Sequence, residues 1–110
     1  NTNNPCLNYL VLRNSGHLMN YLKLFPEYRF QYDEYRKKVH SITQLLHQYY
    51  ISVFVKKEVD KKEIPFALKP LIYELHGLYL KDKQAISWNT VKNYIYELEP
   101  KRLQFVINQL

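Results

Sequence analysis

The chain of 110 residues has only two glycines, one cysteine, one methionine and one tryptophan. With so little glycine it offers no loop of the kind that cradles phosphates in nucleotide-binding families. The single Cys6 cannot form an internal disulfide, so we expect an intracellular, reducing compartment, either cytoplasm or nucleus. No stretch approaches the ~20 apolar residues that a membrane span needs, and the start of the chain does not resemble a signal peptide. We therefore expect no membrane partner.

Tyrosine supplies much of the apolar material that is present. The chain is 46% hydrophobic and 15% aromatic, with eleven tyrosines and five phenylalanines. This content is too high for a disordered tail, and the length fits one domain. We predict a tail or linker over residues 1–6 and a single domain over 7–110. We also expect the chain to be a fragment of a larger protein. Abundant Lys, Asn, Tyr and Ile are typical of AT-rich genomes, including those of large DNA viruses.

A regular apolar stripe predicts one long helix. Eight residues follow one another at alternating steps of four and three: Tyr28, Tyr32, Tyr35, Val39, Ile42, Leu46, Tyr49 and Val53. This is the a/d spacing of a heptad pattern, which places all eight on one side of a helix. We predict a central helix over about 27–55 with this stripe buried.

Capping residues and prolines divide the rest of the chain into further helices. We expect a short helix from a Ser15 cap to Phe25, a helix from Pro70 to about Leu80, a helix capped by Ser87, and a last helix that begins at Pro100. The run from Leu7 to Leu12 is compatible with a strand or with a helical turn. The fold class that follows is all-α, a compact bundle of four to five helices.

Residues for catalysis or metal binding are not grouped in the sequence. His40 and His47 are seven residues apart, or about 10.5 Å along a helix, which is too far to share an ion. Cys6 has no neighbouring histidine, and no serine lies in a strand-turn-helix elbow. We therefore predict no enzyme activity, no metal and no cofactor.

The charge balance favours a polyanionic partner. Sixteen basic residues against ten acidic ones give a net charge of +6 and an isoelectric point near 9.4. Nucleic acid is the first partner that such an excess suggests, and an acidic protein surface is the next. The run Arg36-Lys37-Lys38, beside the apolar stripe, is either a ridge that contacts phosphates or an ordinary solvated face.

Residues 71–98 resemble a helix-turn-helix, through the sequence ISWNTVKNYIYEL after the turn. The resemblance implies that Ser87 caps the second helix and that Val91 anchors it. It also implies an outward face for nucleic acid that includes Trp88, Asn89 and Lys92. On that face Asn89 and Lys92 would reach base edges, and the phosphates would be met by Lys81, Lys83, Lys101 and Arg102. The turn of residues 81–86 is longer than usual in that family and lacks glycine. The alternative is a plain helical hairpin in which Trp88 belongs to the core.

Two hypotheses for function remain. The first is a non-catalytic, nucleic-acid-associated module, to which outward-pointing Tyr50 and Tyr96 would add stacking surfaces for single-stranded bases. The second is a protein-interaction or oligomerisation module that uses part of the stripe as a seam for a partner helix or a second copy. That seam comprises Tyr35, Val39, Ile42, Leu46 and Tyr49. A scaffold portion of a larger enzyme is a third possibility.

Overall fold

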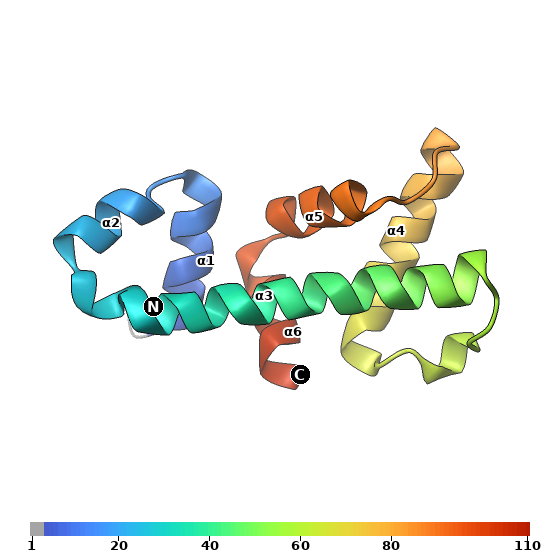
Figure 1. Cartoon of the computed structure of the whole chain (residues 1–110), viewed down its shortest axis with the longest axis horizontal. Helices are drawn as coiled ribbons and strands as arrows, with labels where there is room; N and C mark the ends of the chain where they lie inside the picture. Colours follow the sequence, from blue (N-terminus) through green and yellow to red (C-terminus); the bar gives the residue numbers. More distant parts are fainter. Residues whose placement is uncertain (1–3) are drawn as a thin grey trace.

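The long helix predicted from the heptad stripe forms the axis of the molecule. A computed structural model describes residues 4–110. Helix α3 spans Arg29–Tyr50, follows directly on the 3-10 turn η1, Pro26–Tyr28, and continues into a π-helical segment, Ile51–Val55. The predicted central helix over about 27–55 is confirmed as one helical rod, although its last part is π-helical. Figure 1 shows this rod running the length of the molecule.

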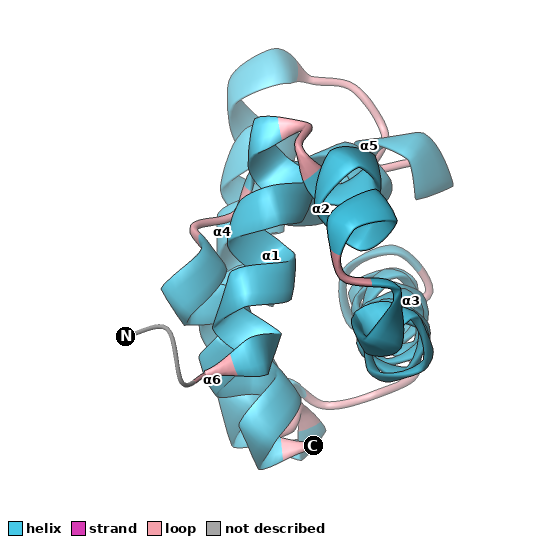
Figure 2. Cartoon of the chain, turned by 90° about the vertical axis from the view of Figure 1, so that its left-hand side faces the viewer, coloured by secondary structure: helices cyan, strands magenta, loops and turns pink. Residues whose placement is uncertain are grey.

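Five shorter α-helices complete the described part of the fold. They are α1 (Pro5–Ser15), α2 (Leu18–Leu24), α4 (Lys69–Asp82), α5 (Trp88–Glu97) and α6 (Pro100–Gln109). The 3-10 turns η3 (Lys61–Glu63) and η4 (Phe66–Leu68) lie between the rod and α4. Seen end-on, α3 lies beside a layer that contains α1, α4 and α6 (Figure 2). The all-α prediction is confirmed over residues 4–110, where no strand occurs and the axes measure 47 × 26 × 21 Å.

The first helix begins earlier than the sequence indicated. The side chain of Asn4 accepts a hydrogen bond from the Leu7 amide at 3.1 Å, and Pro5 occupies the first turn of α1. The expected linker therefore ends before Pro5, and residues 1–3 lie outside the described part of the chain. Ser15 ends α1 instead of capping the next helix, because Gly16 adopts a left-handed φ of 81° that closes α1.

The second half of the chain follows its local signals closely. Ser87 accepts a hydrogen bond from the Thr90 amide, and the Thr90 hydroxyl accepts one from the Ser87 amide, which makes a capping box for α5. Pro100 opens α6 as expected. Helix α4 runs two residues beyond the predicted Leu80 and ends where Lys83 takes a φ of 59°.

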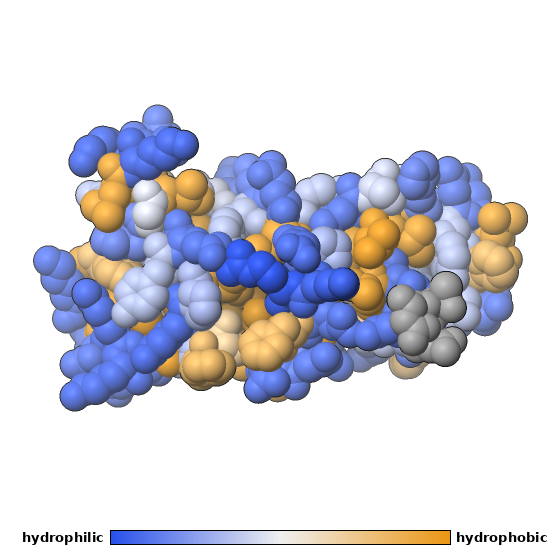
Figure 3. All heavy atoms as spheres, turned by 180° about the vertical axis from the view of Figure 1, so that it is seen from behind, coloured by the Kyte–Doolittle hydropathy of each residue, from blue (hydrophilic) through white to orange (hydrophobic). Residues whose placement is uncertain are grey.

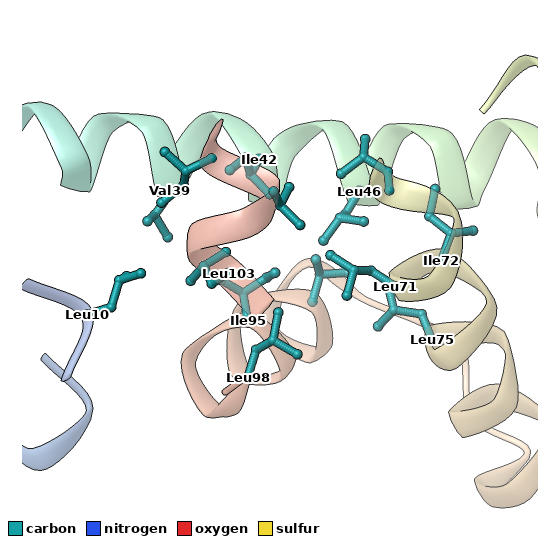
Figure 4. Packing of buried hydrophobic residues seen from close by; sticks show 14 of the residues in the cluster. Leu10, Val39, Ile42, Leu46, Leu71, Ile72, Leu75, Ile95, Leu98 and Leu103 are labelled. Carbon is teal, nitrogen blue, oxygen red and sulfur yellow. The ribbon is translucent and has the colours of Figure 1, made fainter. Parts of the chain in front are cut away.

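The central residues of the heptad stripe are core. Val39, Ile42 and Leu46 are 7%, 2% and 0% exposed. Figure 4 shows them facing side chains from α4, α5 and α6, among them Leu71, Ile95 and Leu103. Burial in the chain's own core leaves these three seam residues unavailable to a partner helix. Tyr35 and Tyr49, at the two ends of the predicted seam, are half-buried.

One seam position shifts by a residue toward the C-terminal end of α3. Tyr50 is 2% exposed and Tyr49 is half-buried, so the prediction that Tyr50 points away from the stripe is wrong. A straight α-helix has 3.6 residues per turn, and a strict heptad therefore drifts by about 20° each repeat. Three repeats after Tyr28 the drift reaches about 60°, which turns Tyr50 toward the core. Tyr96, the other predicted exception, is confirmed as 49% exposed.

Candidate nucleic-acid interface

Helix α5 runs antiparallel to α3 (Figure 1), and Trp88, the first residue of α5, packs against α3. The Trp88 ring lies edge-on to the rings of His40 and His47, with centroid distances of 5.9 and 5.8 Å. Trp88 is half-buried in this position. The outward position that the resemblance implied for Trp88 is therefore not observed, and Trp88 packs as the alternative of a plain helical hairpin expects. Asn89 and Lys92 are exposed, as predicted.

The other predicted phosphate contacts do not share one surface with Lys92. Lys81 lies in the last turn of α4 and Lys83 just beyond it, whereas Lys101 lies in the first turn of α6 beside an apolar groove that includes Phe66. All three lysines are exposed. The helix-turn-helix resemblance groups residues by their distance along the chain, but the cleft that Lys92 lines includes none of these three lysines.

Arg102 is held by a carboxylate. Its guanidinium donates to both oxygens of Glu74, at 3.2 Å from Nη1 and 2.7 Å from Nη2, and the Tyr94 hydroxyl donates to the same carboxylate. The pKa of Glu74 is lowered mainly by the hydrogen bonds from Arg102 and further by the one from Tyr94. The pKa of Tyr94 is raised by burial and by the adjacent Glu74 carboxylate. The cluster clamps α4, α5 and α6 together, so Arg102 is already paired and is a poor candidate for a phosphate contact.

Lys92 instead shares a cleft with basic residues from two other helices. Arg13 comes from α1, Arg36 and His40 come from α3, and Lys92 comes from α5. Tyr9 and Tyr96 line the same cleft, which has a volume of about 230 Å³. Three of the lining residues are formal cations and none is a carboxylate. The cleft is therefore a locally basic surface shared by three helices.

Arg13 is fixed in this cleft by an aromatic contact. Its guanidinium lies 4.7 Å from the centroid of the Tyr96 ring, and the Tyr96 hydroxyl donates to the Arg13 carbonyl at 3.1 Å. Burial lowers the pKa of Arg13, and no carboxylate forms an ion pair with it within residues 4–110. An anion in the cleft would gain from this partly desolvated cation, because attraction is stronger where water is partly excluded.

Arg36 has only a weak partner. Its Nε lies 3.7 Å from Oδ1 of Asp33, and both side chains are largely exposed. Exposed pairs of this kind contribute at most about 1 kcal/mol, so Arg36 can turn toward a phosphate at little cost. Sequence reasoning included Arg36 in a possible ridge and missed Arg13 altogether. The only available signal for Arg13 was its charge, because the contact with Tyr96 spans 83 positions in the sequence.

Residues 4–110 contain neither a group of metal-binding side chains nor a helix that could span a membrane. No group of three or more histidine, cysteine or acidic side chains there could hold a metal ion. Among residues 4–110, no helix combines the length and apolar character needed to cross a membrane. The back of the molecule carries apolar patches separated by hydrophilic side chains (Figure 3).

Compared with known proteins, the chain matches no family model, no curated protein and no solved structure.

Proposed function

We propose that the protein is a non-catalytic, nucleic-acid-associated helical module that binds the sugar-phosphate backbone in the cleft between α1, α3 and α5. The observation that carries this proposal is the cleft lining, with three cations, His40 and no carboxylate. Backbone contacts of this type depend on charge and not on sequence, and they supply most of the affinity in non-specific binding. The net charge of +6 acts in the same direction over a longer range.

The proposal is tested by the salt dependence of binding. Fluorescence polarisation with a labelled oligonucleotide should show affinity that falls steeply as salt rises, because bound phosphates release counterions. The double variant Arg36→Gln with Lys92→Gln should bind more weakly. It should also lower the magnitude of the slope of log affinity against log salt, by about 0.7 for each lost contact to a single strand.

A control variant with the same loss of charge distinguishes binding in the cleft from general attraction by the net charge of the protein. Arg29→Gln with Lys101→Gln removes one arginine and one lysine that are exposed and lie outside the cleft. This control should keep most of the affinity and a slope close to that of the unaltered protein. Equal losses in both double variants would mean that net charge alone governs binding, and the cleft would be rejected as the site.

A protein-interaction role is the second candidate, now without the heptad seam as its surface. The observation that favours it is an apolar groove of about 350 Å³ between η4, α4 and α6. Phe66 and Phe105 line this groove and are 79% and 49% exposed. Exposed apolar surface of this kind marks interaction sites more often than scattered single residues do. Sedimentation at increasing concentration would show self-association if the groove serves a second copy.

A further inference from the structure

A second cavity lies farther along the same flank of α3. Tyr50, Phe54, His76, Tyr79 and Lys57 are among its lining residues, and its volume is about 500 Å³. The π-helical segment Ile51–Val55 forms one wall, closed by a hydrogen bond from the Lys56 amide to the Ile51 carbonyl at 2.8 Å. Such π-helical turns are rare in proteins, and those that occur are often found at functional sites.

Three of the rings around this cavity form a continuous stack with nearly parallel planes. Phe54 and His76 are 4.0 Å apart with an interplanar angle of 15°, and His76 and Tyr79 are 5.9 Å apart with an angle of 12°. His76 is also held by Tyr50, whose hydroxyl lies 3.2 Å from Nδ1. Tyr79 ends the series and is 40% exposed. A flat ring that enters the cavity can therefore continue an existing stack.

The charge at the cavity suits an anionic group attached to such a ring. Lys57 is the formal cation in the lining, where no carboxylate occurs. Its backbone is held in the left-handed region with a φ of 55°, which is uncommon for a residue other than glycine. This conformation fixes the position of Lys57 relative to the π-helical wall. A flat aromatic ring that carries a phosphate fits both features.

The cavity and the basic cleft are joined by one line of residues. Arg36, His40, His47 and Phe54 lie at steps of four, seven and seven, which keeps them on one flank of the rod. Trp88 lies against the two histidines in the middle of this line. From Arg36 to Phe54 the helix rises by about 27 Å. A positively charged surface with aromatic side chains available for stacking is the usual platform for single strands.

We infer that the module binds single-stranded nucleic acid, with its backbone in the cleft between α1, α3 and α5 and one unstacked base in the cavity beside the π-helical segment. This inference rests on the proposed function and adds the class of nucleic acid. A duplex holds its bases in the stack, so it can use the cleft but not the cavity. The cavity therefore selects single strands, and the cleft supplies affinity that both forms share.

The test compares single-stranded and duplex oligonucleotides of about 12 nucleotides, within the roughly 4–16 nucleotides that one small domain covers. Tyr79→Ala should weaken binding of the single strand by roughly 5- to 150-fold, the range expected for loss of one base stack. Binding of the duplex and the salt slope should not change. Phe105→Ala is the matched control, because Phe105 is an aromatic residue of α6 with 49% exposure that does not line the cavity.

A second measurement does not depend on affinity. The fluorescent base analogue aminopurine, placed in the single strand, should be quenched on binding to the unaltered protein and to Phe105→Ala. Binding to Tyr79→Ala should quench it much less. The inference would be overturned if both nucleic acids bound equally well, Tyr79→Ala had no effect and no quenching occurred. The proposed function would then still be tested separately by the cleft variants. Absence of any binding at low salt would overturn both.

Discussion

Truncation of Leu46 tests whether the heptad stripe is the core of a single chain. Leu46 is 0% exposed and lies in the middle of α3. Leu46→Ala removes a buried isopropyl group worth about 2.4 kcal/mol at ~0.8 kcal/mol per carbon. The cavity left behind brings the expected loss to about 3 kcal/mol. In a domain of this size the melting temperature should fall by about 12 °C.

Urea unfolding followed by circular dichroism measures this loss. Leu45→Ala is the matched control, since Leu45 is the adjacent leucine of α3 and is only partly buried. We expect it to cost about 1 kcal/mol, within the range of ordinary substitutions. The unfolding midpoint of each protein should not depend on protein concentration, because the stripe packs within one chain. Equal losses in the two variants, or a midpoint that rises with concentration, would refute the assignment of the stripe to the core.

Three further predictions concern local features. Ser87→Ala should cost about 1 kcal/mol of unfolding free energy through loss of the α5 cap, while Ser41→Ala, at an exposed position inside α3, should cost nothing measurable in urea unfolding. Glu74 has a lowered pKa in the folded protein, so its carboxylate stabilises the fold above the unfolded pKa of about 4.3 and loses this contribution as the pH falls through the folded pKa. Glu74→Gln should therefore flatten the fall in stability with decreasing pH over this acid range. An unchanged profile of stability against pH would count against the clamp. Cys6 is 6% exposed and burial raises its thiol pKa, so iodoacetamide should label the native protein roughly 100-fold more slowly than the urea-unfolded chain, and equal rates would place Cys6 outside the core.

Local signals predicted most of the helices. Pro26 and Pro100 begin helical segments, and Ser87 caps α5, because these effects depend on residues within one turn. The assignment of residues 1–6 to a linker failed at Asn4 and Pro5, whose capping role depends on a helix that the sequence left undecided between strand and helical turn.

Errors in the stripe came from the difference between a heptad and a real helix. The pattern selected Tyr49, whereas a straight helix turns Tyr50 toward the core after three repeats. A two-stranded coiled coil would have kept the stripe in register by supercoiling. Here α3 packs against several helices that cross it, so nothing imposes the heptad period.

The candidate interface could be predicted only in part. Lys92 was identified from its position on α5, but its basic neighbours in the cleft come from α1 and α3. The contact between Arg13 and Tyr96 and the pairing of Arg102 with Glu74 both depend on tertiary packing. Charge and aromatic content suggested the class of partner that we propose, while the surface proposed to bind it could be located only from the fold.

An NMR titration of the labelled protein with a single-stranded oligonucleotide tests the central claim most directly. We expect the amide shifts to concentrate at Arg13, Arg36 and Lys92 around the cleft and at Phe54 and Tyr79 around the cavity. We expect no change in α6 near Lys101. Shifts centred on Lys101 and the groove lined by Phe105, with the cleft unaffected, would contradict the account.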